Sequence, residues 1–417
     1  MKHVLICGAG AVGLCSALFL RERGYEVTVL ERDSTGGDGC SFGNAGMVVP
    51  SHFTPLAAPG AIGLGLRWLL DPGSPFYIRP RLDLALASWI LNFVRAANRA
   101  HVERAGPILR DMLLASRELY EQLADRCDNG FGLAKRGMLI LCQTRSGLEE
   151  ETRAARRARD LDLPVEIVSS ARAADLDPDI GMEIIGAAFY PLDCHLDPRL
   201  LMRKLTELAV GAGVTLRWST PIDGWRTDGA RVTAAVTSLG DVAADEFVLA
   251  AGSWSSELAR SLGCNLPLQG GKGYSFTVPN PAQLPRLPSI LSEAHVAVTP
   301  MGTSLRIGGT MEFAGLDRSI SERRTQAIAA AAARYFPALR AQDIAQVRPW
   351  AGLRPCSPDG LPYIGRFARY SNLCVAAGHA MLGISLAPIT GQLVAQILSG
   401  EQPRVAIEPL TPQRYQT

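Results

Sequence analysis

The stretch VLICGAGAVG at residues 4–13 decides the fold of this chain. Four apolar residues that suit a buried strand lead into a GxGxxG pattern, and the residues that follow suit an apolar helix. In such a unit Gly8 permits a tight turn, Gly10 lets a phosphate approach the backbone, and Gly13 lets the helix pack closely on the strand. Residues 26–30 form a second predicted strand. The stretch therefore predicts a Rossmann-type βαβ unit that binds a dinucleotide.

The acidic residue after that second strand narrows the choice of ligand. Glu31 stands where a carboxylate accepts hydrogen bonds from ribose hydroxyls, and its charge disfavours a 2′-phosphate. A second glycine-rich stretch follows at residues 36–47, which a nicotinamide dinucleotide does not need. It can bring backbone N–H groups and Ser41 towards the flavin end of a longer cofactor. Residues 250–254 end another predicted strand and can pass near the adenine-side phosphates. The sequence therefore favours FAD.

Length, charge and cysteine pattern exclude several other classes of protein. At 417 residues the chain is too long for one compact core, and a net charge of +2 gives no reason to expect a nucleic-acid partner. The nine cysteines are scattered singly, without a CxxC pair. This pattern indicates a reducing compartment and neither a disulfide framework nor a zinc cluster. We therefore expect a cytoplasmic protein without a bound metal.

Strand–helix–strand patterns occur in three separated blocks, with a mainly helical block and a mainly β block inserted between them. This order predicts the α/β class, with a discontinuous Rossmann-type FAD-binding domain and a β-sheet-based substrate domain built from the insertions. We assign residues 1–85, 190–263 and 345–417 to the FAD-binding domain. Residues 86–189 and 264–344 are assigned to the substrate domain.

Local signals predict individual elements inside these blocks. Asp197 followed by Pro198 indicates the N-cap and first residue of a helix that ends at Gly211. Residues 138–142 suit a strand, and residues 84–123 have mainly helical spacing of apolar residues.

One segment resists assignment to a regular element. Residues 50–80 are rich in proline and glycine and contain an apolar cluster around Trp68. Three interpretations stay open: a lid over the substrate pocket, a contact with a membrane surface, or a packed irregular segment.

Five stretches, spread over nearly the whole chain, carry a family resemblance. They are the N-terminal fingerprint with Glu31, SFGNAGM at residues 41–47, KGY at residues 272–274, WAGLRP continuing through SPDGLPYIG at residues 350–365, and GHAMLGISLAP followed by Thr390-Gly391 at residues 378–391. Together they resemble the FAD-dependent D-amino acid oxidase superfamily. Within it the likeness points to the bacterial D-amino acid dehydrogenases and the related glycine and sarcosine oxidases.

The resemblance implies a substrate site around a few side chains. Arg354 corresponds to the arginine that holds the substrate carboxylate, a task that suits a guanidinium because two parallel N–H groups meet two oxygens. Tyr274 corresponds to a substrate-side tyrosine, and a core tyrosine on a strand is the alternative. His52 and His379 fall in matching blocks, where each is either functional or a hydrogen-bonded structural residue.

The resemblance also implies how FAD is held. Cys356 stands close to Arg354, but the register places the cysteine tether of some sarcosine oxidases opposite Gly352, so we expect non-covalent FAD. The loop at residues 378–385 corresponds to the loop that caps the flavin pyrimidine and stabilises the charge of the reduced ring. The predicted cofactor contacts are Gly8, Ala9, Gly10, Ala11, Val12, Gly13, Glu31, Arg32, Ser41, Asn44, Ala45, Gly46, Met47, Ile222, Ala251, Gly252, Trp254, Gly378, His379, Met381, Leu382, Gly383, Ile384 and Ser385.

The implied reaction is the oxidation of a D-amino acid to the imino acid. Hydride leaves Cα for flavin N5, and the electrons pass to a quinone or another acceptor. Residues 51–60 and 378–383 look most like the D-hydroxyproline dehydrogenases. Two alternatives stay open: a glycine- or sarcosine-type oxidase that uses oxygen, and a flavin-carrying subunit of a multi-subunit electron-transfer complex. The implied location is the cytoplasm, or the cytoplasmic face of the inner membrane with a peripheral membrane contact.

Overall fold

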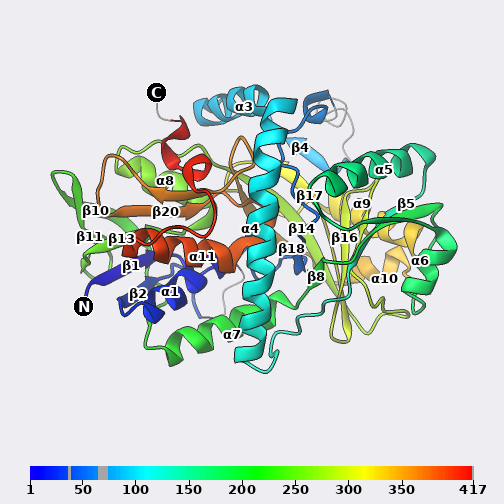
Figure 1. Ribbon diagram of the computed structural model, residues 1–417, viewed down its shortest axis with the longest axis horizontal. Coiled ribbons are helices and arrows are strands. Elements are labelled where there is room, and N and C mark those ends of the chain that lie inside the picture. Colours follow the sequence, from blue (N-terminus) through cyan, green and yellow to red (C-terminus); the bar gives the residue numbers. More distant parts are fainter. Residues whose placement is uncertain (36–38, 64–73, 416–417) are drawn as a thin grey trace.

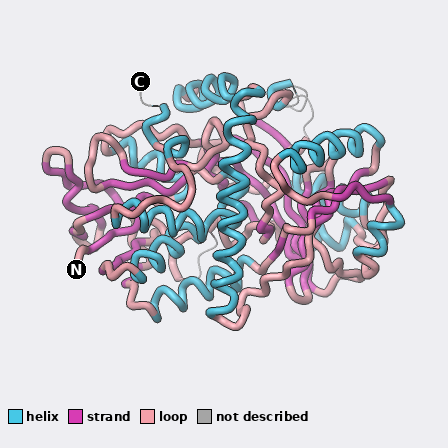
Figure 2. The backbone as a smooth tube through the Cα atoms, viewed as in Figure 1, coloured by secondary structure: helices cyan, strands magenta, loops and turns pink. Residues whose placement is uncertain are grey.

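Two large β-sheets lie side by side along the long axis of the molecule, and helix α4 (Arg99–Arg126) stands between them (Figures 1 and 2). The computed structural model describes residues 1–35, 39–63 and 74–415. Trp68 and the apolar cluster around it, for which a lid or a membrane contact is predicted, lie outside the described residues.

The first sheet has six strands and contains the predicted βαβ unit. Its order is β19-β20-β13-β1-β2-β9, and all neighbours are parallel except the pair β19 and β20. The strands are β1 (His3–Cys7), β2 (Glu26–Leu30), β9 (Thr215–Arg217), β13 (Glu246–Leu249), β19 (Tyr363–Arg366) and β20 (Leu373–Ala377).

Both faces of this sheet are covered, which explains why its strands are apolar on both sides. One face packs against α1 (Ala11–Glu22), α7 (Pro198–Gly211) and α11 (Gly383–Ser399), which share a core with α4. The other face packs against α8 (Ser255–Ser261) and a small antiparallel sheet. The strands of that sheet are β10 (Ile222–Asp228), β11 (Arg231–Thr237) and β12 (Val242–Ala243).

The second sheet is the predicted substrate-domain sheet and has nine strands. Its order is β18-β14-β17-β16-β15-β5-β7-β6, with β4 also paired to β17. Helices α6, α9 and α10 pack on one face through a continuous apolar core. The elements are β4 (Phe76–Ile78), β5 (Met138–Cys142), β6 (Glu166–Ser169), β7 (Gly186–Tyr190), β14 (Gln269–Pro279), β15 (Ser289–Leu291), β16 (Val296–Met301), β17 (Ser304–Phe313), β18 (Trp350–Cys356), α6 (Ser170–Leu176), α9 (Glu322–Tyr335) and α10 (Ala341–Gln346).

Short elements connect the two halves of the molecule. A two-stranded ribbon joins the glycine-rich segment after β2 to the segment before α7, and α5 adds to the surface of the second sheet. These remaining elements are β3 (Met47–Val48), β8 (Cys194–His195), α5 (Arg145–Asp160), and the 3-10 turns η1 (Gly252–Trp254), η2 (Ala380–Leu382), η3 (Glu408–Leu410) and η4 (Pro412–Tyr415).

The structure divides the chain differently from the sequence prediction at two strands. Strands β4 and β18 fall inside the segments assigned to the FAD-binding domain, yet both are strands of the second sheet. The backbone of β18 bonds to β14, and a strand's own residues do not reveal its partner. The predicted helical block at residues 84–123 is also two helices, α3 (Leu84–Ala96) and α4. Asn98 caps the second, accepting a hydrogen bond from the His101 N–H at 2.9 Å.

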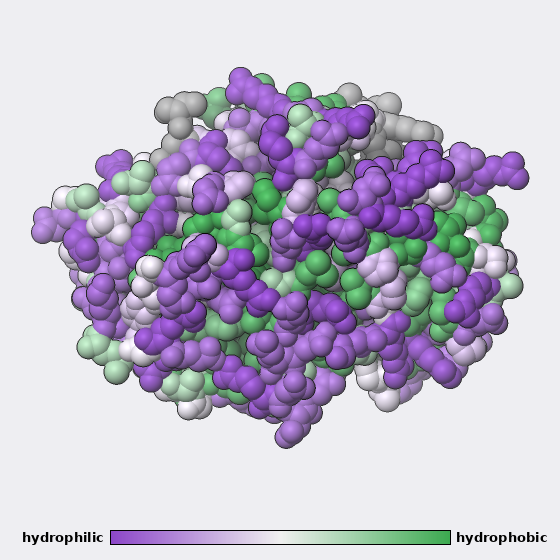
Figure 3. All heavy atoms as spheres, viewed as in Figure 1, coloured by the Kyte–Doolittle hydropathy of each residue, from purple (hydrophilic) through white to green (hydrophobic). Residues whose placement is uncertain are grey.

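Among the described residues, one helix is long and apolar enough to cross a membrane by length and composition alone, namely residues 380–399. It is two-thirds buried (67%) and packs against α1 and α4. Helix α11 is therefore a core helix of the fold. The face of the molecule in Figure 3 is mainly hydrophilic, with hydrophobic atoms showing between polar side chains, as on an ordinary folded surface.

Candidate functional site

A cavity of about 950 Å³ opens at the carboxyl ends of the parallel strands of the first sheet. The loops after β1, β2, β13 and β20 all contribute to its wall. Ligands of open α/β sheets bind at this edge, where helix N-termini and loop backbones converge. Pockets that enclose drug-sized ligands measure roughly 300–1,000 Å³, so this volume lies near the upper end, as a dinucleotide requires.

At Gly8 and Gly13 of the fingerprint, neighbouring backbone atoms leave no room for a side chain. Gly8 has a φ of +108°, and a Cβ there would lie 2.6 Å from the Ala250 carbonyl oxygen. A Cβ on Gly13 would lie 2.0 Å from the Gly8 carbonyl oxygen, so only glycine lets α1 approach β1. Gly10 differs, because the nearest atom to its Cβ position is Ser41 Oγ at 3.6 Å. Its open side faces the cavity, where a ligand phosphate can approach the backbone.

Glu31 fixes the shape of this loop. One oxygen of its carboxylate accepts a hydrogen bond from the Ala9 N–H at 2.8 Å, and the other accepts one from the Asp33 N–H at 3.0 Å. The side chain also lines the cavity. Each carboxylate oxygen can accept more than one bond, so Glu31 can hold the loop and still receive ribose hydroxyls.

A cation–π contact closes one end of the cavity. The guanidinium carbon of Arg32 lies 3.4 Å from the centroid of the Trp254 ring, and both side chains line the wall. The contact joins the loop after β2 to the loop after β13. It also presents a positive charge at the dinucleotide end of the site.

The start of α11 supplies backbone donors to the wall. Among the described residues no side chain caps this helix, and Gly383 and Ile384 line the cavity. Two buried hydrogen bonds hold the helix start in place: Tyr120 Oη donates to the Ile384 carbonyl at 2.7 Å, and Ser385 Oγ donates to the Met47 carbonyl at 2.8 Å. Uncapped N–H groups with the positive end of the helix dipole suit an anionic ligand.

The side chain of His379, just before this helix, has a hydrogen-bond partner. Its Nε2 lies 2.9 Å from Thr390 Oγ1 in a buried contact, and burial lowers its pKa to about 3. The imidazole is therefore neutral at physiological pH, and it lines the cavity without carrying charge.

Most of the predicted cofactor contacts meet in the cavity wall. The wall contains Gly8, Ala9, Gly10, Ala11, Val12, Glu31, Arg32, Ser41, Asn44, Ile222, Ala251, Gly252, Trp254, His379, Gly383 and Ile384. As the described residues form it, the wall does not include Gly13, Ala45, Gly46, Met47, Gly378, Met381, Leu382 or Ser385.

The sequence analysis missed one side of the cavity. The first half of α7 lines it with Asp197, Arg199 and Arg203, and Cys40 and Phe42 line it from the second glycine-rich stretch. The Asp197-Pro198 pair predicted where this helix begins, and the structure confirms it, since Asp197 accepts from the Arg199 N–H at 2.8 Å. The face that the helix turns towards the cavity depends on its packing against α1, for which the local sequence has no signal.

Arg354 lies over a strip of glycines on the edge of the second sheet. In the antiparallel pair of β14 and β18, Gly271 stands opposite Arg354, and Gly273 stands opposite Gly352. A Cβ on Gly273 would lie 2.1 Å from Arg354 Nη1, so the missing side chain makes room for the guanidinium. Among the described residues, this guanidinium makes its hydrogen bond to the Thr310 carbonyl, from Nη1 at 2.7 Å. Nε–H and Nη2–H make no hydrogen bond to the part of the chain that the structure describes, and they form a parallel pair that can meet a carboxylate.

Arg354 also lies close to the cavity. Leu353 and Pro355, its neighbours on β18, are part of the wall. Cys40 is another wall residue. Burial raises the pKa of its thiol, while the nearby positive charge of Arg354 tends to lower that pKa. Arg354 itself is not in the wall as the described residues form it, and its guanidinium lies near the cavity.

Tyr274 lies on the other face of the sheet. Side chains alternate along a strand, so Tyr274 points away from the face of Gly273 and Arg354. It is 1% exposed, and its hydroxyl donates to Glu312 Oε2 at 2.7 Å. Burial, with the Glu312 carboxylate, raises its pKa. Of the two roles left open for Tyr274, this geometry therefore favours the core tyrosine over the substrate-side tyrosine. Tyr274 has the position of a core tyrosine, because register and face follow from the sheet as a whole.

His52 belongs to a polar chain that the sequence did not indicate. Ser51 Oγ donates to Asp193 Oδ2 at 2.5 Å and lies 3.0 Å from His52 Nδ1. Burial raises the pKa of Asp193 to about 7 and lowers that of His52 to about 4. His52 is not in the cavity wall as the described residues form it.

Comparison with known proteins agrees with this geometry. The family model described as FAD dependent oxidoreductase (DAO) matches residues 3–397. The chain is 33% identical to a D-amino acid dehydrogenase of Granulibacter bethesdensis, over 99% of both chains. It is also 33% identical to a D-amino acid dehydrogenase of Bradyrhizobium diazoefficiens, over 99% of this chain and 98% of the other.

A solved structure supports the fold. The glycine oxidase of Geobacillus kaustophilus superposes with a TM-score of 0.79, at 24% identity and with full coverage of both chains. The cavity volume, the crowded glycines at positions 8 and 13, and the uncapped start of α11 all fit a bound FAD. The chain therefore belongs to the FAD dependent oxidoreductase (DAO) family, with FAD as its cofactor.

Proposed function

We propose that this protein is a D-amino acid dehydrogenase, which oxidises its substrate at Cα to the imino acid and passes the electrons to an acceptor such as a quinone. The observation that carries the proposal is the guanidinium of Arg354, which lies on a glycine surface beside a dinucleotide cavity with two parallel N–H donors available. The names of the relatives that match nearly the full chain support the substrate class.

The residues of the chain act by binding and orientation. Arg354 binds the substrate carboxylate through Nε and Nη2, while the Thr310 carbonyl holds Nη1. The missing side chains at Gly273 and Gly352 make room for the Arg354 guanidinium and for the Trp350 ring, respectively. FAD, when bound, accepts the hydride that leaves Cα. A neutral amine needs no general base for that step, so the main task of the protein is positioning and the exclusion of water.

The direct test is an anaerobic screen in which the flavin absorbance of the purified protein is followed. D-alanine, D-proline and cis-4-hydroxy-D-proline are compared with their L-enantiomers and with glycine and N-methylglycine. We expect D-amino acids to bleach the flavin, and an added quinone or dye to restore its colour faster than oxygen does. Rapid reoxidation by oxygen would favour a glycine- or sarcosine-type oxidase instead. No bleaching without a partner subunit would favour a flavin-carrying subunit.

We further propose that α3 is the membrane-contacting surface if a membrane quinone is the acceptor. Leu84, Leu91 and Val94 on this helix are 90%, 50% and 45% exposed, and Leu82 just before it is fully exposed. The buried side of the helix packs on the second sheet, where Trp89 Nε1 donates to the Cys356 carbonyl at 2.9 Å. Exposed leucines beside basic side chains suit an anionic lipid surface.

The charges around α3 have the sign that such a surface requires. Arg95 and Arg104 are exposed, and neither has an acidic partner among the described residues. Both line a polar pocket at the junction of α3 and α4. Attraction to anionic headgroups therefore adds to the burial of the leucines.

Co-sedimentation with vesicles tests this surface. The wild type should sediment with vesicles of equal parts phosphatidylcholine and phosphatidylglycerol. A variant with Leu84→Asp and Leu91→Asp should bind these vesicles about ten-fold or more weakly, because it loses two leucines that would be buried in the lipid. Val210→Asp is the matched control, since Val210 is 57% exposed on α7. Equal sedimentation of all three proteins would rule out α3 as the contact.

A further inference from the structure

A β-bulge lies directly under Arg354. Strand β14 pairs with β17 in register at Lys272 and Glu312, but the register shifts before Tyr274, which stands opposite Gly309. In this shift Thr310 and Met311 stand opposite the single residue Gly273, and Thr310 has a φ of +72°. A left-handed backbone is strained for a β-branched residue, and it persists only where its surroundings enforce it. The carbonyl of Thr310 is the acceptor that holds Arg354 Nη1.

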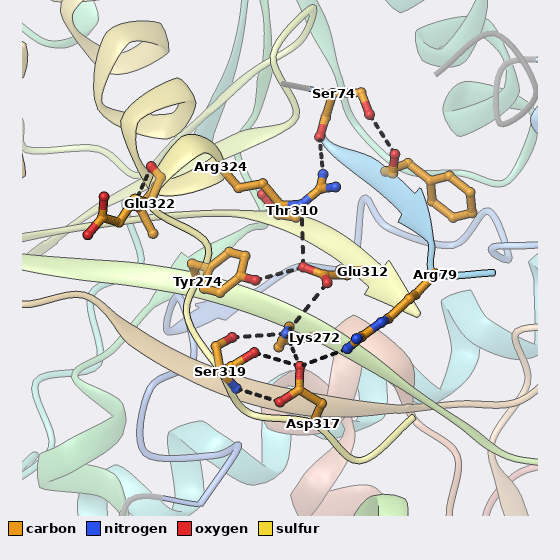
Figure 4. A network of polar contacts seen from close by, with 12 residues as sticks. Ser74, Arg79, Lys272, Tyr274, Thr310, Glu312, Asp317, Ser319, Glu322 and Arg324 are labelled. Carbon is orange, nitrogen blue, oxygen red and sulfur yellow. Dashed lines mark hydrogen bonds and ion pairs between the residues drawn. The ribbon is translucent and has the colours of Figure 1, made fainter. Parts of the chain in front are cut away.

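The side chains that enforce the bulge meet on the opposite face of the sheet (Figure 4). Glu312 accepts the Tyr274 hydroxyl at 2.7 Å, and its other oxygen lies 3.5 Å from Lys272 Nζ. Lys272 and Tyr274 are the two neighbours of Gly273 on β14. Glu312 thus bonds to both sides of the point where the register shifts.

Arg324 is a third partner of Glu312, and Lys272 has further partners of its own. Arg324 of α9 lies 3.4 Å from its carboxylate and also donates to the Ser74 carbonyl at 3.3 Å. Lys272 Nζ donates to Asp317 Oδ2 at 3.0 Å and to the Ser319 carbonyl at 2.9 Å. Arg79 lies 3.9 Å from Asp317, so the network joins three basic and two acidic side chains.

Burial makes these ionic groups costly to leave unpaired. Lys272, Glu312 and Arg324 are only 1%, 8% and 7% exposed, respectively. Removing one partner would leave a buried charge uncompensated, so the paired arrangement is rigid. Bulges beside active sites commonly redirect a side chain, and a bulge fixed from behind can hold one precise direction.

We infer that Glu312 is a positioning residue for Arg354, acting through Tyr274, Lys272 and the carbonyl of Thr310. The inference rests on the proposed function, since it assumes that Arg354 binds the substrate carboxylate. Glu312 does not touch the substrate. It keeps Thr310 in its left-handed conformation, so that Nη1 is occupied and the Nε and Nη2 donors face the carboxylate.

The test uses Glu312→Gln and the milder Tyr274→Phe in the FAD-loaded protein. D-proline is compared with pyrrolidine, which lacks the carboxylate, and with pyrrole-2-carboxylate, which has the carboxylate but no oxidisable Cα–H. We expect roughly ten- to hundred-fold weaker binding of pyrrole-2-carboxylate and a similar loss of kcat/KM for D-proline, mainly in KM. The rate with pyrrolidine should stay within about two-fold of wild type.

A matched control lies at the end of helix α9, which packs on the same sheet. Tyr335 donates its hydroxyl to Glu293, so Tyr335→Phe removes a partly buried tyrosine–glutamate bond without touching the bulge. It should leave carboxylate binding unchanged. If Tyr335→Phe weakens binding as much as Tyr274→Phe does, or if pyrrolidine oxidation falls in parallel with D-proline oxidation, Glu312 has only a structural role.

A double variant separates this inference from the proposed function. If Glu312 acts through Arg354, adding Glu312→Gln to Arg354→Ala should cost little more than Arg354→Ala alone. Fully additive losses would overturn the positioning role while leaving Arg354 as the carboxylate ligand. If Arg354→Ala lowers kcat/KM equally for D-proline and for pyrrolidine, the proposed function of Arg354 fails, whatever the result for Glu312.

Discussion

Replacing Arg354 with alanine is expected to lower kcat/KM for a D-amino acid by roughly a hundred- to a thousand-fold, the equivalent of about 3–4 kcal/mol of transition-state positioning. Arg354→Lys should be impaired less, because it keeps one charge but loses the two parallel donors. Both variants should still bind FAD, since the fingerprint glycines lie on the other sheet. Anaerobic stopped-flow reduction of the flavin measures the loss.

The decarboxylated substrate is the control for Arg354. Pyrrolidine has no group for the guanidinium to bind, so it should be a poor substrate of the wild type and lose little more in Arg354→Ala. An equal loss with D-proline and pyrrolidine would mean that Arg354 supports the fold or the flavin. Its 2.7 Å bond to the Thr310 carbonyl makes that outcome a real alternative.

Gly13→Ala is expected to abolish most FAD binding. The new Cβ would meet the Gly8 carbonyl oxygen at 2.0 Å, so α1 must move away from β1, and the phosphate-binding turn moves with it. We expect the affinity for FAD to fall roughly a hundred-fold or more, because the contact is with rigid backbone on both sides. Titration of the apoprotein with FAD measures the affinity, and acid precipitation should release the non-covalent cofactor from the wild type.

Gly211→Ala is the matched variant for this experiment. Gly211 is also helical, at the end of α7, and no described atom lies within 4 Å of its Cβ position. It should bind FAD like the wild type. A Gly13→Ala protein that kept full FAD affinity would show that the close packing of α1 on β1 is not needed for binding.

The sequence alone predicted those parts of the fold that depend on neighbouring residues. The helix from Asp197-Pro198 to Gly211 begins and ends where the capping signals placed it, and strand β5 has its predicted bounds. A helix cap or a turn is decided within a few residues, so its signal is local. Most of the predicted cofactor contacts likewise lie in the cavity wall, because loops that bind a dinucleotide need specific small residues at fixed positions.

Pairing between distant strands could not be predicted in the same way. The sequence placed β18 in the FAD-binding domain and left Tyr274 as either a substrate-side tyrosine or a core tyrosine. Strand β18 pairs with β14, and Tyr274 faces the other side of the sheet. A shift of one residue in register reverses the face of every side chain, and register is set by the whole sheet.

The sequence by itself therefore determined the βαβ unit and its dinucleotide ligand, because each depends on a short pattern with one physical purpose. The family resemblance selected Arg354 as the candidate ligand of the substrate carboxylate. Only the tertiary structure decided what holds that arginine. The bulge at Thr310 and the carboxylate of Glu312 act together across residues 272–324, which are far apart in the chain. Buried charges take partners wherever the packed core places them, and that placement exists only in the folded protein.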